Sequence, residues 1–318
     1  MLYLVTGGAG FIGSWICETL LAAGHFVRVI DDLSSGVADN LPSAVDLIEA
    51  DLLDQGALER AMAGVDGVFH QAARPSVPRS VEDPRGSHRA NATGTLEVLL
   101  AAREAGAKVV YAGSSSAYGD TQELPKHEDM GLAPQSPYAA DKVAGELYAR
   151  VCARVYGVRT VTLRYFNVFG PRQRADSPYS GVIAKFCMNA LNGDLCTVHG
   201  DGEQSRDFTF VRDVAHGNLL AMEADCPPGA VINLAGGNRY SLLDMLDELE
   251  RLVGHPIERS FTATRAGDVK HSQAAVEKAA ELLGFRAQTS FADGLRETLD
   301  WYRNAAGNAD ETSVRSQA

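Results

Sequence analysis

The first 112 residues alternate short apolar runs with longer segments of helical period. Residues 2–5 (LYLV) form an apolar run, and the glycine-rich stretch 6–13 leads from it into a helical pattern over 14–23. Four similar runs follow, at 26–30, 45–49, 66–70 and 108–112, with a polar loop over 33–42 and helices expected over 58–62 and 84–105. Strands alternating with helices predict βαβ crossovers and a doubly wound parallel sheet, an α/β fold.

The rest of the chain extends this sheet and adds a second unit. Strands are expected at 160–163 and 230–234, the latter after a helix over 214–224. Loops and shorter elements separate them, with strands at 196–198 and 206–211 and helices at 183–191, 242–253, 274–283 and 291–302. We therefore predict a smaller, sequence-interleaved C-terminal substrate lobe. The expected boundaries are 1–168 plus 213–236 for the sheet domain, 169–212 plus 237–303 for the lobe, and 304–318 for a flexible tail.

Composition excludes several classes of protein. The 318 residues are 45% hydrophobic and 22% charged, as in ordinary soluble proteins. A formal net charge of −12 with no basic stripe argues against a nucleic-acid partner. The absence of an apolar run of about 18 residues argues against a membrane span, and a start directly in a strand argues against a signal peptide. Five isolated cysteines without metal-ligand spacing indicate reduced thiols, a cytoplasmic location and no metal site.

The glycine-rich stretch carries the first chemical signal. Gly7, Gly10 and Gly13 lie three residues apart between a strand and a helix. Such glycines allow a tight turn, close approach of a phosphate and close helix packing, and a helix N-terminus favours a bound diphosphate. Asp31 follows at the end of the next apolar run and is the expected ligand of the adenosine ribose, favouring NAD over NADP. The alternative for Asp31 is a turn acid that caps the next element.

A second signal joins a serine-rich loop to a helix start. The strand over 108–112 runs into a loop that begins at Ser114, and ligands bind beyond the carboxyl ends of parallel strands. Ser136 and Pro137 are good residues for starting a helix, so that Tyr138 and Lys142 share one helical face. An ammonium and a positively charged nicotinamide favour the tyrosine phenolate, which then takes a proton from an alcohol while a hydride leaves its carbon. Taken alone, the tyrosine and lysine are an ordinary surface pair.

These and further motifs resemble the extended short-chain dehydrogenase/reductase family, in its nucleotide-sugar branch. The motifs are TGGAGFIG (6–13), DDL (31–33), DL (51–52), HQAA (70–73), NATGT (91–95), GSSSAYG (113–119), SPYAADK (136–142), RYFNVFGPRQ (164–173) and GDGEQSRDFTFVRDVA (200–215). Further segments, SVPRS (76–80), LPKHED (124–129) and GDVKHS (267–272), are similar to NAD-dependent UDP-sugar 4-epimerases that act on UDP-N-acetylhexosamines. The resemblance implies a Rossmann domain with bound NAD and a UDP-sugar substrate.

The resemblance also implies residue roles. Ser114, Tyr138 and Lys142 would be catalytic. The residues expected to bind NAD are Gly7, Gly10, Phe11, Ile12, Gly13, Asp31, Asp32, Ser35, Asp51, Leu52, Gln71, Ala72, Ala73, Asn91, Tyr138, Lys142 and Tyr165. Those expected to bind the UDP-sugar are Ser76, Ser114, Ser115, Tyr138, Asn167, Val182, Arg206, Arg265, Asp268 and Ser272. Among these, Arg206 and Arg265 are cations in an acidic chain, and a guanidinium matches a diphosphate.

The expected reaction inverts C4 of a UDP-hexose through a transient 4-keto sugar. The small side chain of Ser272 resembles that of enzymes admitting an N-acetyl group, so UDP-GlcNAc/UDP-GalNAc are expected substrates beside UDP-Glc/UDP-Gal. Arg74 departs from that pattern and leaves a UDP-glucuronate 4-epimerase open. A nucleotide-sugar 4,6-dehydratase is disfavoured because Ser115 and Ser116 occupy the positions of its acid/base pair. A non-catalytic NAD-binding regulator is disfavoured by the intact catalytic set. The family implies a homodimer formed through 84–105 and 137–156.

Overall fold

A parallel seven-stranded sheet forms the centre of the protein. The computed structural model describes residues 1–175, 181–264 and 270–315, with side chains described as far as residue 305. The strand order is β11-β6-β5-β4-β1-β2-β3, and every neighbouring pair is parallel. The strands are β1 (Leu2–Thr6), β2 (Phe26–Asp31), β3 (Asp46–Glu49), β4 (Gly67–His70), β5 (Lys108–Ser114), β6 (Thr160–Tyr165) and β11 (Ala230–Leu234). The predicted doubly wound sheet is confirmed.

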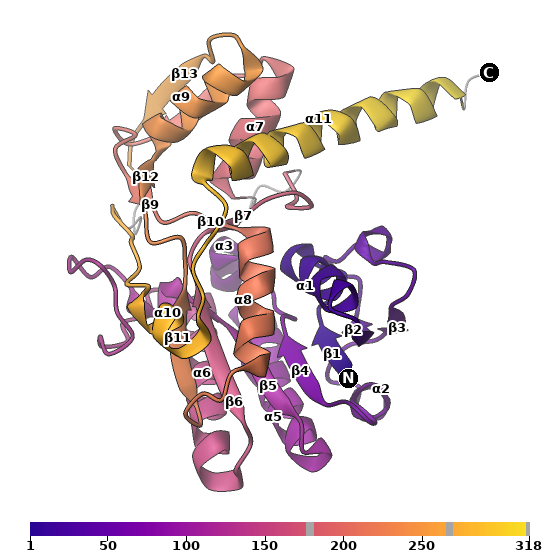
Figure 1. The fold of residues 1–318 in the computed structure, drawn as a ribbon. Helices are drawn as coiled ribbons and strands as arrows, with labels where there is room; N and C mark the ends of the chain where they lie inside the picture. Colours follow the sequence, from indigo (N-terminus) through magenta and orange to yellow (C-terminus); the bar gives the residue numbers. More distant parts are fainter. Residues whose placement is uncertain (176–180, 265–269, 316–318) are drawn as a thin grey trace.

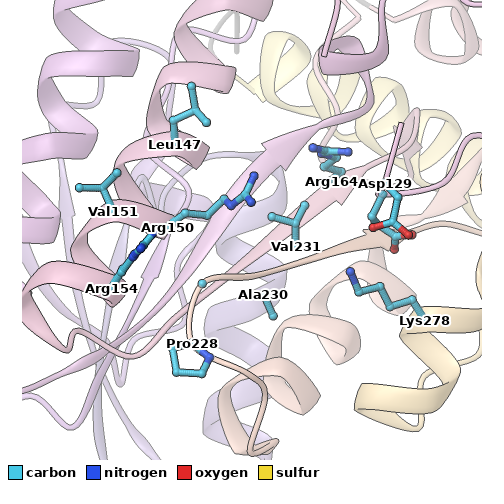
Figure 2. Close-up of a pocket in the computed structure, with 12 residues that line it drawn as sticks. Asp129, Leu147, Arg150, Val151, Arg154, Arg164, Pro228, Ala230, Val231 and Lys278 are labelled. Carbon is cyan, nitrogen blue, oxygen red and sulfur yellow. The ribbon is translucent and has the colours of Figure 1, made fainter. Parts of the chain in front are cut away.

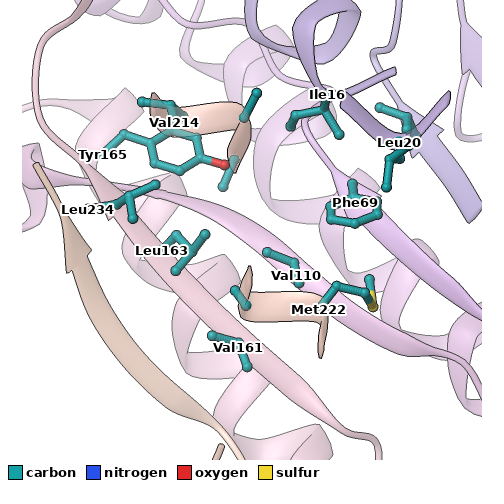
Figure 3. Packing of buried hydrophobic residues seen from close by; sticks show 14 of the residues in the cluster. Ile16, Leu20, Phe69, Val110, Val161, Leu163, Tyr165, Val214, Met222 and Leu234 are labelled. Carbon is teal, nitrogen blue, oxygen red and sulfur yellow. The ribbon is translucent and has the colours of Figure 1, made fainter. Parts of the chain in front are cut away.

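Helices cover both faces of this sheet (Figure 1). Alternate strand residues divide between two cores, with Val5 and Val29 in one and Leu4 and Ile30 in the other. One face carries α1 (Phe11–Ala22), α8 (Val211–Glu223) and α10 (Glu277–Leu283), whose side chains share the first core with the strands (Figure 3). The other face carries α2 (Gln55–Met62), α5 (Gly94–Ala105) and α6 (Pro137–Tyr156).

The smaller lobe packs around a core of its own beyond the carboxyl edge of the sheet (Figure 1). Its helices are α7 (Val182–Asn192), α9 (Leu242–Val253) and the start of α11 (Phe291–Arg315). Three short strand pairs complete it: β7 (Val168–Phe169) with β10 (Thr209–Phe210), β9 (Ser205–Arg206) with β12 (Tyr240–Ser241), and β8 (Cys196–His199) with β13 (Arg259–Thr262).

Between β4 and β5 the chain is less regular than predicted. The helix expected over 84–105 begins as α4 (Pro84–His88), passes through a π-helical turn (Arg89–Thr93) and continues as α5. A short helix that the pattern did not predict, α3 (Val77–Glu82), precedes it. Short 3₁₀ helices lie at Ala38–Asn40, in the expected polar loop, and at Ser115–Tyr118.

Three expectations for the C-terminal half are corrected. The strand expected over 206–211 is broken into β9 and β10, because the Asp207 carboxylate turns aside to accept backbone N–H groups from Gly236, Gly237 and Ala274. The helix expected from residue 274 begins at Glu277, and α10 packs on the sheet although its residues were assigned to the lobe. The segment expected as a flexible tail continues α11 to Arg315.

Candidate active site

A cavity of about 740 Å³ lies at the carboxyl edge of the sheet, between the sheet and the smaller lobe. Its wall includes the ends of β1, β2, β5 and β6 and residues that follow β4. Most residues predicted to bind NAD or the UDP-sugar line it. They are Gly7, Gly10, Phe11, Ile12, Gly13, Asp31, Asp32, Ser35, Asp51, Leu52, Gln71, Ala72, Ala73, Ser76, Ser114, Ser115, Tyr138, Lys142, Tyr165, Asn167 and Val182.

The turn between β1 and α1 is built as a dinucleotide diphosphate requires. Gly7 has a φ of 67°, and a Cβ there would lie 2.6 Å from Ala72 Cα. A Cβ on Gly13 would lie 2.2 Å from the Gly7 carbonyl oxygen. Gly10 precedes α1 without a side-chain cap, so the first N–H groups of the helix are free to bind an anion.

Asp31 ends β2 beside this turn. Its Oδ2 accepts the Ala9 N–H at 3.0 Å and its Oδ1 accepts the Leu33 N–H at 2.9 Å. Burial raises the pKa of this carboxyl, while the two backbone donors act against that rise. The carboxylate is therefore fixed in orientation where it lines the cavity, as a ligand of ribose hydroxyls requires.

Acids beyond Asp31 have local partners. Asp32 Oδ1 accepts the Ser34 N–H at 3.0 Å and the Ser34 hydroxyl at 2.6 Å. Asp51 Oδ2 lies 3.4 Å from Arg89 Nη2, and its Oδ1 accepts the Leu53 N–H. Both acids thus shape the end of the cavity near β2 and β3.

A buried histidine that the sequence did not single out supports the floor of the site. His70 Nδ1 lies 2.7 Å from Thr6 Oγ1, and Nε2 lies 2.9 Å from Thr95 Oγ1. Thr95 donates to the Asn91 carbonyl oxygen, so Nε2 carries the proton and Nδ1 accepts from Thr6. Burial, followed by the charge of Lys142, lowers the pKa of His70 to about 3. The ring is therefore neutral with both nitrogens engaged, and it cannot serve as the base.

A hydrogen-bonded trio holds the middle of the cavity wall. The Tyr165 hydroxyl donates to Asn218 Oδ1 at 2.9 Å, and Gln71 Nε2 donates to the Tyr165 oxygen at 3.0 Å. Burial raises the pKa of Tyr165, so its hydroxyl stays protonated. Two predicted cofactor residues from β4 and β6 are thereby joined to α8.

The three predicted catalytic side chains meet in the cavity. Ser114 ends β5, and its hydroxyl lies 2.8 Å from Ser116 Oγ and near enough to the Tyr138 hydroxyl to lower the pKa of that tyrosine by hydrogen bonding. Tyr138 stands in the first turn of α6, which Ser136 caps by accepting the Ala139 N–H. Burial raises the pKa of Tyr138, and the Ser114 hydrogen bond lowers it. Lys142, which we expected to lower the pKa of Tyr138, does not contribute to this shift in the protein without NAD.

Lys142 lies one helical turn beyond Tyr138. Its side chain is 5% exposed, and Nζ donates to the Ala112 carbonyl oxygen at 3.0 Å. Burial lowers the pKa of this ammonium to about 8, against the favourable charge of Asp141. Asp141 is itself fixed by Ser87, whose hydroxyl donates to it at 2.6 Å. The active-site ammonium is thus held by β5 on one side and has an anchored carboxylate on the other.

Asn91 sits in the π-helical turn and does not line the cavity. Its Oδ1 accepts the Arg74 N–H at 2.7 Å, and its Nδ2 donates to Ser87 Oγ at 3.2 Å. In the protein alone it fixes the backbone of the segment after Ala73, and its contact with NAD stays a prediction.

The substrate residues divide into two groups. Ser76 caps α3, Asn167 has a φ of 32° and donates to the Asp207 carbonyl oxygen at 3.1 Å, and Val182 begins α7. These line the cavity together with Ser115. Arg206 and Ser272 are not among its lining residues; Arg206 Nη1 donates to the Ser205 and Lys270 carbonyl oxygens, and the Ser272 N–H donates to Ser205 O at 3.0 Å. Arg265 and Asp268 lie outside the described residues.

The sequence reading missed the loop after Gly170. Arg172 lines the cavity with a φ of 72°, and its guanidinium stands 4.4 Å from the Trp15 ring centre and pairs with Glu18. It also donates to Ser14 Oγ at 3.3 Å. The loop is thereby fastened to α1. The motif RYFNVFGPRQ includes this arginine, but only Tyr165 and Asn167 of the motif were predicted to bind cofactor or substrate.

A second cavity, of about 680 Å³, opens on the other flank of α6 (Figure 2). Arg150 and Arg154 line it from α6, and Asp129 and Lys278 line it from the opposite side.

Within the described ranges, no group of three or more His, Cys, Asp or Glu side chains converges as metal ligands, and no helix has the length and apolarity of a membrane span.

The doubly wound sheet, the glycine turn and the Ser–Tyr–Lys set define a dinucleotide-dependent enzyme class. The chain belongs to the NAD dependent epimerase/dehydratase family, whose model matches residues 3–235. It is 39% identical over 314 residues to the UDP-glucose 4-epimerase of Mycolicibacterium smegmatis, covering 96% of this chain and 99% of that protein.

Solved structures of UDP-sugar 4-epimerases are also similar to this chain over nearly its whole length. A UDP-N-acetylglucosamine 4-epimerase from Methanobrevibacter ruminantium, in complex with UDP-N-acetylmuramic acid, matches with a TM-score of 0.92 and 38% identity, covering 95% of this chain and 98% of that one. A UDP-glucuronic acid 4-epimerase from Bacillus cereus, in complex with UDP-glucuronic acid and NAD, matches with a TM-score of 0.89 and 32% identity, covering 96% and 100%.

Proposed function

We propose that the protein is an NAD-dependent UDP-sugar 4-epimerase with UDP-N-acetylhexosamines as its main substrates and UDP-glucose and UDP-galactose as further ones. The observation that carries this proposal is the meeting of Ser114, Tyr138 and Lys142 in the cavity that also holds the glycine turn and Asp31. NAD, when bound, supplies the acceptor for the hydride that leaves C4 and the donor that returns it to the other face.

The side chains supply the proton transfer. Tyr138 takes the proton of the 4-hydroxyl group and returns it after the sugar has turned, and the Ser114 hydroxyl orients the same oxygen. Because burial raises the pKa of Tyr138, forming the phenolate needs positive charge nearby. We assign that charge to the nicotinamide of bound NAD together with the Lys142 ammonium. The neutral His70 leaves the role of base to the tyrosine.

The substrate's diphosphate is assigned to Arg206 and Arg265, and its sugar pocket to the neighbourhood of Ser115 and Ser272. Ser272 is small and buried, which supports room for an N-acetyl group. The similarity to the M. ruminantium UDP-N-acetylglucosamine 4-epimerase favours the same substrate class.

We rank a uronic acid substrate second, because the guanidinium that would favour it already has a partner. Arg74 lines the cavity, but its Nη1 lies 3.3 Å from Asp83 Oδ2, and its backbone is held by Asn91. A guanidinium already paired with a carboxylate is less available to a second one. A dehydratase is disfavoured as well, since Ser115 and Ser116 provide hydroxyls where an acid and a base are needed.

Isotope tracing tests the chemistry. UDP-N-acetylglucosamine carrying deuterium at C4 is incubated with the purified protein, and the 4-epimer is examined by proton NMR and mass spectrometry. We expect the product to retain the deuterium at C4, because the hydride returns within one active site. Tyr138→Phe should abolish formation of the epimer. A product that has exchanged its C4 label with solvent would contradict the proposal.

We further propose a cytoplasmic homodimer. The outer face of α6 exposes Leu147, Tyr148, Val151 and Val155, an unusual number of apolar side chains on one helix. All five cysteines are free thiols, as expected in a reducing compartment. Val151→Glu should shift the mass found by light scattering from dimer to monomer, while Phe26→Glu, at an exposed apolar position on β2, should not. A wild-type monomer would contradict the proposal.

A further inference from the structure

Lys126 is a buried ammonium for which the proposed reaction has no stated use. Its side chain is 2% exposed, and Nζ donates to the Gly119 carbonyl oxygen at 3.1 Å. Within the ranges that the structure describes, no carboxylate forms an ion pair with it; burial lowers its pKa, and the more distant charge of Asp120 acts against that lowering. Burying a charged group without a counter-ion opposes folding, so a side chain of this kind needs another reason to be present.

The backbone of Lys126 binds the segment that carries Ser272. The Lys126 N–H donates to the Gln273 carbonyl oxygen at 2.8 Å, and its own carbonyl oxygen accepts the Ala275 N–H at 2.9 Å. Lys126 and Ala274 thus form an isolated parallel bridge. The segment is fixed on its other side by the bond from the Ser272 N–H to Ser205 O.

The side chain of Lys126 reaches the other wall of the site. Gly119 ends the turn that starts at Ser114, and its φ of 63° with an added Cβ only 2.0 Å from Ala133 O admits no other residue. The ammonium therefore holds the carbonyl group of a residue whose backbone is already constrained. Its charge strengthens that hydrogen bond beyond what a neutral donor gives.

Asn233 closes this connection into a ring of hydrogen bonds. The Tyr118 hydroxyl donates to Asn233 Oδ1 at 2.6 Å, and Asn233 Nδ2 donates to the Lys126 carbonyl oxygen at 2.9 Å. Tyr118 is the residue before Gly119, so the serine-rich turn is joined to Lys126 by two routes. Each of these side chains is buried.

We propose that Lys126 is a positioning residue that sets the distance between the turn carrying Ser114 and the segment carrying Ser272. This inference rests on the proposed epimerase function. In the proposed reaction the turn orients the reacting hydroxyl, and the segment carrying Ser272 is assigned to the side of the sugar near C2, so a fixed spacing between the two would hold C4 of an N-acetylhexosamine in place for reaction. The residue belongs to the LPKHED motif, which the reaction itself does not use.

The test compares Lys126→Met and Lys126→Gln with the wild-type, NAD-loaded enzyme. Methionine has nearly the length of lysine and no donor, whereas glutamine retains a neutral donor. We expect Lys126→Met to lower kcat for UDP-N-acetylglucosamine about 10- to 100-fold, because small misplacements of reacting groups are costly. KM should change less than about twofold, the effect on UDP-glucose should be smaller, and Lys126→Gln should recover part of kcat.

The thermal midpoint separates positioning from a structural role. Removing an unpaired buried charge should leave the midpoint of Lys126→Met unchanged or raise it. A lower midpoint with loss of bound NAD would overturn the inference in favour of a structural role. A raised KM with unchanged kcat would overturn it in favour of a charge that attracts the diphosphate.

Two further comparisons complete the test. Lys278→Met, at a lysine of α10 that lines the second cavity and not the active-site cavity, should leave kcat and KM unchanged. If the wild-type enzyme is active and Lys126→Met is equally active, the positioning role is contradicted while the proposed function stands. A wild-type enzyme that forms no 4-epimer contradicts the proposed function, and the inference with it.

Discussion

Replacing Lys142 with methionine separates the chemical use of this ammonium from its effect on folding. Burial lowers the pKa of Lys142 from 10.5 to about 8. At about 1.4 kcal/mol for each pKa unit, this difference corresponds to about 3 kcal/mol. The variant also leaves the Ala112 carbonyl oxygen without its donor, which costs about 1–3 kcal/mol. Removing the buried charge stabilises the variant by the first amount, and losing the hydrogen bond destabilises it by the second. In the cofactor-free protein at pH 7, the free energy of unfolding of Lys142→Met should therefore exceed that of the wild type by about 0 to 2 kcal/mol.

The direction of the pH dependence follows from the lowered pKa. Below pH 8 both the folded and the unfolded protein hold the proton, so the full unfavourable term opposes folding. Between pH 8 and 10.5 the folded protein releases the proton first, and the wild type gains stability relative to Lys142→Met. The variant should thus be at least as stable as the wild type at pH 7 and less stable at pH 10.

Urea unfolding followed by circular dichroism at both pH values measures this crossing. In parallel, kcat should fall on the order of 100-fold or more, since proton transfer loses its charged partner. Lys108→Met is the matched control, because Lys108 is a buried lysine at the opposite end of β5 and donates to Met222 O and Ala224 O. It should keep kcat. Equal destabilisation of Lys142→Met at both pH values would refute the reasoning.

Two other substitutions test the ends of the cavity. Ser272→Tyr should reduce activity on UDP-N-acetylglucosamine while sparing UDP-galactose, as measured by parallel kinetics; equal loss on both would count against a gate at this position. Gly13→Ala places a Cβ 2.2 Å from the Gly7 carbonyl oxygen, so we expect a loss of about 1–3 kcal/mol in stability and less bound NAD in the purified protein. Gly131→Ala, whose Cβ would meet nothing within 4 Å, is its control, and similar NAD contents in the two variants would argue against a crowded turn.

Features set by neighbouring residues could be predicted from the sequence. The glycine turn, Asp31 at a strand end, and Tyr138 and Lys142 on one helix face depend on periodicity, turn chemistry and capping within a few positions. The parallel, doubly wound character of the sheet followed from the alternation of strands and helices, whereas the order of its strands came from the structure. Together with the family resemblance that the sequence motifs carry, these local rules named many of the residues that line the cavity.

Features set by distant contacts could not be predicted. The π-helical turn places Asn91 against the Arg74 backbone, 17 positions away in the sequence. Asp207 breaks a strand to bind N–H groups far along the chain. The left-handed backbone of Arg172 depends on Trp15 and Glu18, more than 150 residues earlier in the sequence. No periodic pattern contains such contacts.

The elements of the substrate lobe were harder to predict from the sequence for a related reason. Its strands are two to four residues long, and segments from several parts of the chain pair to form it. Arg206 and Ser272 come together through Ser205 and Lys270, not through any motif spacing. Family likeness could name these residues, but their place beside the cavity and not on its lining came only from the structure.

The measurement that tests the central claim most directly is an incubation of the purified protein, without added NAD, with UDP-N-acetylglucosamine, UDP-glucose and UDP-glucuronate in parallel. Products are separated by chromatography and identified by proton NMR at the anomeric and C4 positions. We predict the 4-epimer of UDP-N-acetylglucosamine, a 4-epimer of UDP-glucose, and no turnover of UDP-glucuronate. Turnover of UDP-glucuronate alone, a 4-keto-6-deoxy product, or no epimer from any of the three with NAD then added would contradict the account.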